Sequence, residues 1–202
     1  MTRTFVALLL PPAWIEYLGA VTERLREGTS GMSWVKSGNI HVTVRFLGDL
    51  GDSGVKRASD GILRTAASLE APVARLGGLG AFPSLTRPRV LWMGLSEGEE
   101  AVRAAGNALV DGLRLAGFGP PEKPFRPHMT LARVREGARG LDAIRTATLP
   151  APPPAEPLDR IAVMKSELHP AGSRYTALTE VRLRPPGGTA PTPSRPGSNS
   201  ES

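Results

Sequence analysis

Two of the three histidines in this chain carry the same short pattern, a histidine followed two residues later by a threonine. The copies are His41-Val42-Thr43-Val44 and His128-Met129-Thr130-Leu131. An imidazole has an ordinary pKa of about 6.5, so it can take up or release a proton near neutral pH. A hydroxyl can donate a hydrogen bond to an oxygen that gains negative charge during a reaction. Two of each suit hydrolysis of a phosphodiester, with one histidine as base and the other as acid.

The spacing matters because each copy lies in an apolar run typical of a β-strand. Residues i and i+2 of a strand point to the same face. We therefore expect His41 and Thr43 to project together into a cleft, and His128 and Thr130 to do the same. The apolar residues between them would pack into the core on the opposite face.

These two strands occupy equivalent places in a repeated order of elements. The residue pattern predicts strand, helix, histidine-bearing strand, helix and strand, and then nearly the same series again. The predicted strands cover 4–10, 40–47, 73–79, 90–95, the second copy of the pattern, 160–167 and 175–182. The predicted helices cover 13–26, 55–69, 99–115 and 138–146, with a loop at 28–39. Such a duplication predicts two pseudo-symmetric lobes that bring His41 and His128 to opposite sides of one cleft.

Composition narrows the class of protein only moderately. The chain has 202 residues, 40% hydrophobic and 22% charged, which fits a globular fold with a real core. A net charge of +6 favours an anionic partner such as phosphate or nucleic acid, although a generally arginine-rich composition gives the same value. The absence of cysteine excludes disulfides and cysteine nucleophiles. The first apolar run is too short to span a membrane and ends at Pro11-Pro12, so we expect a soluble cytoplasmic protein.

Paired histidines also occur in metal centres and in protein cores. A metal centre is the main alternative, but no third histidine or carboxylate lies at ligand spacing, so we expect no metal. The second alternative is that His41 and His128 merely line the core, which the repetition of the whole pattern disfavours. His169 lacks the threonine and lies in a turn rich in proline and glycine, and we assign it no role.

Several further stretches resemble the two-histidine (2H) phosphoesterase superfamily, specifically the bacterial and archaeal RNA 2′,3′-cyclic phosphodiesterases, also called 2′-5′ RNA ligases. The resemblance extends in order over nearly the whole chain, to about Arg184. The first copy departs from the family in having Val44 where leucine is usual, which keeps that position apolar. The supporting stretches are Arg3-Thr4-Phe5-Val6-Ala7, Trp34-Val35, Asn39-Ile40-His41, Phe46-Leu47-Gly48, Gly78-Leu79-Gly80-Ala81-Phe82-Pro83, Arg87-Pro88-Arg89-Val90-Leu91-Trp92, Phe125-Arg126-Pro127-His128, Thr130-Leu131-Ala132-Arg133 and Met164-Lys165-Ser166-Glu167-Leu168.

The resemblance implies an α+β, bilobal fold in which antiparallel sheets line a central cleft and helices lie outside. It also implies cofactor-free, metal-independent hydrolysis of a terminal RNA 2′,3′-cyclic phosphate to a 2′-phosphomonoester, with 2′-5′ ligation as the reverse reaction. Family roles make His41 the proton donor and His128 the proton acceptor, while Thr43 and Thr130 bind phosphate oxygens. The expected partner is RNA with a cyclic phosphate end or a cyclic nucleotide, without a membrane, and the expected state is a monomer.

Three residues near the two copies are candidate substrate contacts. Phe46 is a candidate for stacking on a base, as aromatic side chains do with exposed bases. Core packing is the equal alternative, because strand alternation places Phe46 opposite His41. Arg133 is a candidate phosphate contact, although alternation places it opposite Thr130 unless the strand twists or bulges. Arg126 precedes the strand and could reach the mouth of the cleft.

Three loop cations, Lys36, Arg87 and Arg89, are candidates to hold an RNA backbone or are simply solvated. Residues 1–184 are expected to form a single domain, and residues 185–202, rich in Pro, Gly and Ser, a disordered tail. Two alternatives to an RNA-end enzyme stay open. One is a phosphodiesterase for cyclic mononucleotides or other small cyclic phosphates; the other is a non-catalytic RNA-binding module, which the intact acid-base pair disfavours.

Overall fold

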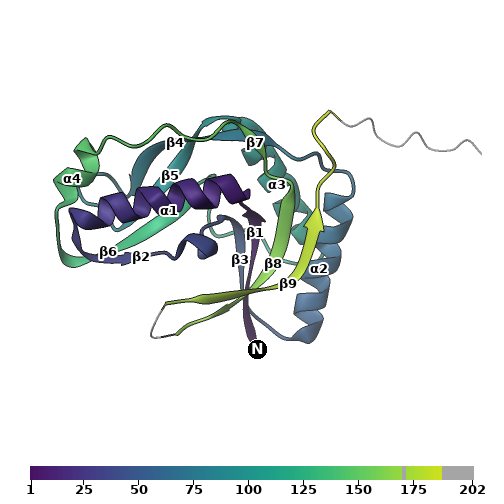
Figure 1. Ribbon diagram of the computed structural model, residues 1–202. Helices are drawn as coiled ribbons and strands as arrows, with labels where there is room; N and C mark the ends of the chain where they lie inside the picture. Colours follow the sequence, from purple (N-terminus) through teal and green to yellow (C-terminus); the bar gives the residue numbers. More distant parts are fainter. Residues whose placement is uncertain (170–171, 188–202) are drawn as a thin grey trace, which may run out of the picture.

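The computed structural model describes residues 1–169 and 172–187, and in that part of the chain nine strands form one sheet with antiparallel pairing (Figure 1). The order across the sheet is β7-β4-β5-β6-β3-β1-β8-β9, and β2 pairs with β6 beside this path. The strands are β1 Thr2–Leu9, β2 Ser30–Trp34, β3 Val42–Leu50, β4 Val73–Phe82, β5 Val90–Glu97, β6 Met129–Arg139, β7 Glu156–Pro157, β8 Arg160–Glu167 and β9 Arg174–Arg182. The helices are α1 Pro12–Glu27, α2 Asp52–Ala66, α3 Glu99–Leu115 and α4 Leu141–Thr146, with a 3₁₀ turn η1 at Ser37–Asn39.

The sheet consists of two halves that meet at a single backbone pair, Val42 with Met129. One half contains β3, β1, β8 and β9; the other contains β6, β5, β4, β2 and the short β7. Strands of the two halves run in different directions in Figure 1, so the sheet curls. The predicted fold class, α+β with two related halves of antiparallel sheet, is confirmed. The two lobes are parts of one continuous sheet.

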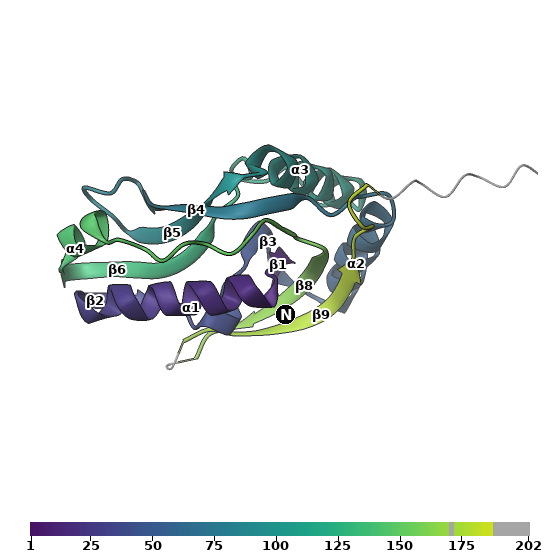
Figure 2. The same cartoon turned by 45° about the horizontal axis from the view of Figure 1, so that its top comes forward.

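Three long helices pack on this sheet where the spacing of apolar residues predicts helices. α2 and α3 lie side by side at one side of the molecule, while α1 lies along the half that contains β2 and β6 (Figures 1 and 2). In α1 the buried residues are Trp14, Leu18, Val21 and Leu25, which recur every three or four positions and so share one face. Burial of each such side chain contributes about 1.5–3 kcal/mol.

Two glycines inside α3 permit close packing that a larger residue would prevent. Each costs about 1 kcal/mol of helix propensity relative to alanine. A Cβ at Gly112 would lie 1.9 Å from Thr65 Oγ1 on α2. A Cβ at Gly106 would lie 2.0 Å from the ring of Phe125, which begins the segment leading to His128. Glycine at position 106 therefore lets α3 pack directly against Phe125, in the segment that leads to His128.

The structure differs from the predicted elements mainly near β2 and β6. The sequence predicts a loop at 28–39, but Ser30–Trp34 is a strand because it pairs with β6. β6 continues to Arg139, so the helix predicted from 138 begins at Leu141. The proline-rich stretch at 150–157, which the sequence predicts to be a connector, contains the two-residue strand β7, which pairs with β4.

Two predictions fall partly or wholly outside the described residues. The turn predicted at 170–172 includes two residues, 170 and 171, that the structure does not describe. Of the tail predicted at 185–202, only 185–187 are described. None of the helices within the described ranges is long and apolar enough to cross a membrane.

Candidate active site

The single pair that joins the two halves also brings the two histidine patterns together. Val42 and Met129 follow the two histidines directly, and both are fully buried. The two histidines and the two threonines are only partly buried, because alternation turns them to the other face. When Val42 lies opposite Met129 in an antiparallel pair, His41 comes opposite Thr130 and Thr43 opposite His128.

Both imidazoles are held by the same kind of hydrogen bond. His41 Nδ1 lies 2.7 Å from the carbonyl oxygen of Asn39, and His128 Nδ1 lies 2.8 Å from that of Arg126. A carbonyl oxygen can only accept, so in both rings Nδ1 carries a proton and donates it. The other nitrogen, Nε2, then has a lone pair in the neutral ring and is the atom available for proton transfer.

The two Nε2 atoms differ in their partners. Nε2 of His41 lies 2.9 Å from Thr43 Oγ1, and in the neutral ring it accepts a hydrogen bond from that hydroxyl. Nε2 of His128 has no hydrogen-bond partner among residues 1–169 and 172–187. The first histidine is therefore already engaged with its threonine, whereas the second leaves its acceptor atom free.

Aromatic side chains enclose His41. Its ring stacks on Phe5 with the ring centres 4.9 Å apart, and Tyr175 packs edge-on at 5.4 Å. Burial lowers the pKa of His41 from its ordinary value; the hydrogen bond to the Asn39 carbonyl opposes this, and positive charge on His128 lowers the pKa further. In the free protein, His41 is thus held toward its neutral form near pH 7.

Two aromatic side chains, Phe82 and Trp92, lie near the ring of His128. Phe82 packs edge-on against its ring with a centre-to-centre distance of 5.1 Å, and Trp92 lies 6.3 Å away. The indole of Trp92 lies directly over Gly80 of β4, where a Cβ would come within 2.2 Å of the ring. Glycine at that position leaves space for the indole of Trp92.

Each histidine strand bulges at the fourth residue of its pattern. Against β1, pairing passes from Thr43 to Arg45 and leaves Val44 as the extra residue. Against β5, pairing passes from Thr130 to Ala132 and leaves Leu131 as the extra residue. A bulge interrupts the alternation of side chains between the two faces of a strand. The same irregularity thus occurs at the same place in both halves.

The bulges move Phe46 and Arg133, each five residues after a histidine, to the histidine side of the sheet. Phe46 is 63% exposed, and its ring lies 5.7 Å from Phe5, which stacks on His41. The prediction that Phe46 lies on the other face of the sheet from His41 is wrong. The alternative that Phe46 packs in the core is wrong as well. Arg133 is exposed and follows Leu131 and Ala132, both fully buried, so the bulge that would return it to the side of Thr130 is present.

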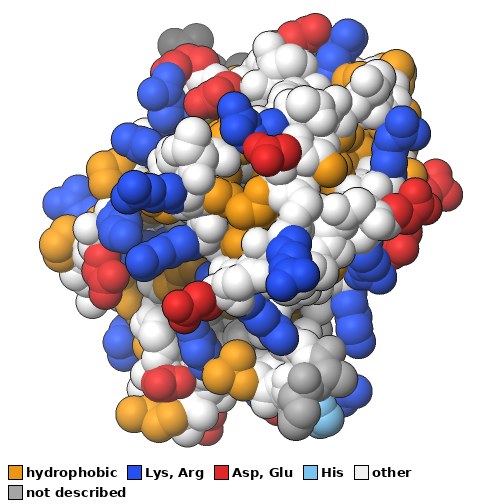
Figure 3. Space-filling model, turned by 90° about the vertical axis from the view of Figure 1, so that its left-hand side faces the viewer, with side chains coloured by type: hydrophobic (Ala, Val, Ile, Leu, Met, Phe, Trp, Pro, Cys, Tyr) orange, Lys and Arg blue, Asp and Glu red, His pale blue; other side chains and the backbone are white. Residues whose placement is uncertain are grey.

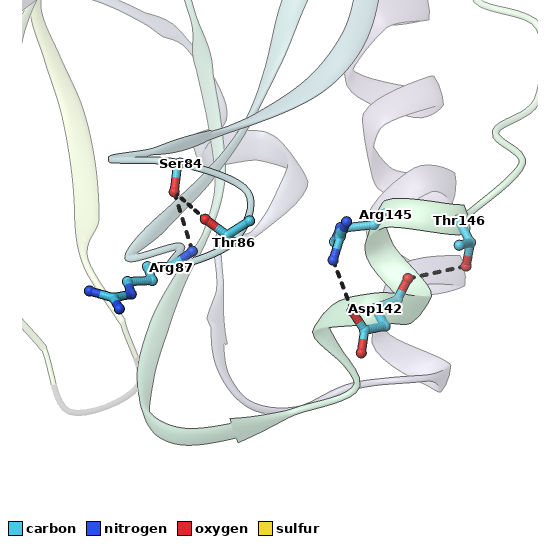
Figure 4. Close-up of polar contacts among 6 residues, drawn as sticks. All are labelled: Ser84, Thr86, Arg87, Asp142, Arg145 and Thr146. Atoms are coloured by element: carbon cyan, nitrogen blue, oxygen red, sulfur yellow. Dashed lines mark hydrogen bonds and ion pairs between the residues drawn. The ribbon is translucent and has the colours of Figure 1, made fainter.

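The other candidate cations lie outside this group. Arg126, Lys36 and Arg89 are exposed, and no described contact joins their side chains to the histidines. Arg87 lies in the loop between β4 and β5, where its backbone N–H donates to Ser84 Oγ at 3.3 Å. Figure 4 shows its side chain pointing away from this loop and from the Asp142–Arg145 ion pair of α4. The structure therefore assembles the two histidines, the two threonines and Phe46, with Arg133 on the same side.

The sequence prediction misses the groups that orient the imidazoles. The amino-acid sequence gives no sign of the carbonyl groups of Asn39 and Arg126, because every residue has a backbone carbonyl. Phe5, Phe82 and Trp92 lie in stretches that resemble the family, so a signal for them existed. Tyr175 reaches His41 only through the pairing of β9 with β8 and of β8 with β1.

Beside Phe46 lies a hollow of about 210 Å³, lined also by Arg3, Thr4, Gly48 and Asp49. It opens next to the exposed face of the phenyl ring and has a cation and a carboxylate at its edge. No group of three or more His, Cys, Asp or Glu side chains placed to hold a metal ion occurs among the residues that the structure describes.

Comparison with known proteins identifies the family. The model of the 2′-5′ RNA ligase superfamily matches residues 11–170. A Thermus thermophilus protein named RNA 2′,3′-cyclic phosphodiesterase is 33% identical over 198 residues and is matched over 90% of each chain. A protein of the same name from Aeropyrum pernix is 35% identical over 113 residues, which cover 56% of this chain and 62% of that one. The crystal structure of the Thermus thermophilus protein TT0787 superposes with a TM-score of 0.70 at 31% identity, over 91% of this chain and 99% of that one.

A curled antiparallel sheet with related halves is the two-histidine phosphoesterase fold. The chain belongs to the 2′-5′ RNA ligase superfamily.

Proposed function

We propose that this protein hydrolyses the 2′,3′-cyclic phosphate at the end of an RNA chain and leaves a 2′-phosphomonoester. The observation that carries this proposal is the meeting of two His-Thr pairs at the Val42–Met129 bridge, each with Nδ1 bonded to a carbonyl and Nε2 available for proton transfer. Relatives named RNA 2′,3′-cyclic phosphodiesterase support the choice of substrate.

In this mechanism His128 is the base. Its Nε2 bears a free lone pair and takes a proton from the attacking water as the new P–O bond forms. His41 is the acid, and it gives a proton from Nε2 to the 3′ oxygen as the P–O3′ bond breaks. Phosphate then remains on the 2′ oxygen. With a ribose 5′ hydroxyl in place of water as the nucleophile, the same ring opening would join RNA ends through a 2′-5′ bond.

The acid role requires His41 to acquire a proton. Burial lowers the pKa of His41, and its Nε2 accepts from Thr43 in the neutral state. An incoming phosphate anion favours the charged imidazole by direct attraction and gives the Thr43 hydroxyl a new acceptor. Substrate binding thus promotes the protonation that the departing 3′ oxygen needs.

Thr43, Thr130 and Arg133 serve the phosphate itself. The two hydroxyls donate to non-bridging oxygens as negative charge builds on them. The guanidinium group of Arg133, on the same side of the sheet and three residues after Thr130, donates to the phosphate. Phe46, exposed beside a hollow, stacks on the base of the terminal nucleotide.

We also propose that residues 1–184 are the catalytic unit and that the chain acts as a monomer. Leu183 is buried, the backbone N–H of Arg184 donates to the Leu69 carbonyl, and that of Ala71 donates to the Arg184 carbonyl. These contacts support a boundary of the catalytic unit at 184. A chain cut after 184 should retain the activity of the full chain.

The decisive experiment incubates the protein with a chelator and two kinds of substrate, an oligoribonucleotide ending in a 2′,3′-cyclic phosphate and free 2′,3′-cyclic mononucleotides. Hydrolysis of the oligonucleotide to a 2′-phosphate end is expected. Turnover of mononucleotides alone would favour the small-molecule alternative. If the protein binds RNA but turns over no cyclic phosphate, it is a non-catalytic RNA-binding module and the proposed activity is wrong.

A further inference from the structure

The surface that extends from His128 along β6 carries arginines without carboxylate partners. Arg133 and Arg135 are exposed, and neither forms an ion pair with any residue that the structure describes. Two arginines on the helices are compensated, since Arg26 pairs with Glu23 and Arg103 pairs with Glu100. Arg133 and Arg135 therefore keep positive charge that no carboxylate of the described residues offsets through an ion pair.

Both arginines lie on one face of the sheet. Ser33 of β2 is the pairing partner of Arg133, and side chains of directly paired residues lie on the same face. Nε of Arg135 donates to Ser33 Oγ at 2.8 Å, which places Arg135 on that face too. Residues two apart along a strand are separated by about 7 Å. The guanidinium groups therefore follow each other along β6, leading away from Thr130.

The opposite face of the same strands is closed. Met32 and Val134 line a small, mostly apolar pocket together with Leu141 and Ile144 of α4. On the other face, Arg133 and Arg135 are exposed. Figure 3 looks at the end of the molecule that carries β2, β6 and α4, and there Lys and Arg side chains outnumber Asp and Glu around a hollow with hydrophobic side chains at its floor.

We propose that the Arg133–Arg135 face of β6 is the path of the RNA chain on the 5′ side of the cyclic phosphate end, with Arg135 bound to the phosphate that precedes the terminal nucleotide. The inference rests on the proposed function. β3 and β6 run antiparallel at the Val42–Met129 bridge, so Phe46 and Arg135 extend from opposite ends of the histidine site. A terminal base stacked on Phe46 therefore leaves the β6 end for the preceding nucleotide. Planar guanidinium groups donate two hydrogen bonds to a phosphate, which suits a repeating anionic backbone.

This path makes the protein selective for oligonucleotide ends over mononucleotides, which have no preceding phosphate. It also makes that selectivity depend on salt, because each phosphate contact releases counterions from the RNA. For a single strand, the slope of log affinity against log salt changes by about 0.7 for each contact.

The test measures kcat/KM at several salt concentrations for a 2′,3′-cyclic mononucleotide and for an oligoribonucleotide ending in the same nucleotide. Arg135→Gln should lower the oligonucleotide-to-mononucleotide ratio about fivefold and flatten the salt slope for the oligonucleotide by about 0.7. Arg135→Lys, which keeps the charge, should retain most of the slope. Arg64→Gln removes an exposed arginine from the last turn of α2 and should change neither value.

An unchanged ratio and slope in Arg135→Gln, or equal losses on both substrates, would overturn this path. Thermal unfolding of each variant shows whether loss of the Ser33 hydrogen bond affects folding. Fluorescence anisotropy with a labelled oligoribonucleotide ending in a 3′-phosphate reads the same salt slope without catalysis. If the native protein turns over neither substrate, the proposed function fails. If it turns over mononucleotides but Arg135 has no effect on the ratio or on binding, only the RNA path fails.

Discussion

The two histidine-bearing strands share one backbone plan and differ in what surrounds each imidazole. Both histidines donate from Nδ1 to the carbonyl two residues earlier, and both strands bulge three residues after the histidine. His41 is stacked on Phe5 and bonded to Thr43. His128 has aromatic rings at its edge and a free Nε2.

The repeat therefore sets where the histidines lie, while the aromatic neighbours of His41 bury its ring. Burial lowers the pKa of His41 and holds it toward the neutral form in the free protein. Nε2 of His128 has no hydrogen-bond partner in the described part of the chain. Substitutions in the two halves should separate these contributions, with the largest effect at the histidines themselves.

Replacing either histidine should remove the acid or the base and nearly abolish turnover. We expect His41→Ala and His128→Ala each to lower kcat by about 10³-fold or more, within the range of general acid-base catalysis. Single-turnover assays with a cyclic-phosphate oligoribonucleotide measure the loss, and circular dichroism with thermal unfolding controls for folding. Retained activity in one variant would show that only the other half supplies a catalytic histidine.

The threonines should matter unequally. Valine keeps the shape of threonine and removes the hydroxyl, so Thr130→Val should lower kcat about 10²-fold through loss of one donor to the phosphate. Thr43→Val should lower it less, because loss of this hydroxyl also removes a hydrogen bond that stabilises the neutral ring of His41 and so eases its protonation. Steady-state kcat of both variants provides the comparison. Equal losses would mean that the hydrogen bond in the free protein has no catalytic consequence.

Phe46 and Arg133 occupy equivalent positions in the two halves, but their substitution should change different kinetic constants. Phe46→Ala removes a stacking surface and should raise KM about tenfold, in line with stacking contributions of about 1–3 kcal/mol per base. Phe46→Trp is the matched control and should keep KM near that of the native protein. Arg133→Gln should instead lower kcat, because charge on the phosphate grows during the reaction. An effect of Arg133→Gln on KM alone would place this arginine away from the reacting phosphate.

The smallest expected effect is a shift of the pH profile. kcat/KM reports groups of the free enzyme, so it should fall as pH rises through the lowered pKa of His41, below about 6.5. Tyr175→Ala admits water to His41 and weakens the burial that disfavours the charged ring. The pKa then rises, and the alkaline limb moves to higher pH by a fraction of a unit.

The check on this shift is the profile of Tyr175→Phe between pH 5 and 8. That variant keeps the ring against His41 and should leave the limb in place. A move toward lower pH in Tyr175→Ala would contradict desolvation as the leading cause.

Strand periodicity predicts the fold and the four central side chains because alternation is intact from each histidine to its threonine. It fails at the next residue, where Val44 and Leu131 are extra against β1 and β5. An inserted residue is defined by the partner strand, so the pattern of one strand contains no sign of it. Phe46 is predicted on the wrong face for this reason.

Other features depend on contacts between distant parts of the chain. β2 is a strand because β6 lies beside it, and alternation over Met32, Ser33 and Trp34 is too short to predict a strand. Gly106 weakens the prediction of α3 when read as a local helix breaker. The physical reason for this glycine is the ring of Phe125, which packs where a Cβ would lie.

The Val42–Met129 bridge also bears on how this architecture changes over evolutionary time. Two halves of a sheet that pair through one residue of each histidine-bearing strand, among the described residues, can accumulate substitutions around their histidines separately. A new aromatic neighbour in one half alters the proton affinity of one imidazole while the bridge keeps the other in place. Substitutions around one histidine can then set its proton affinity apart from that of the other without any change in the backbone.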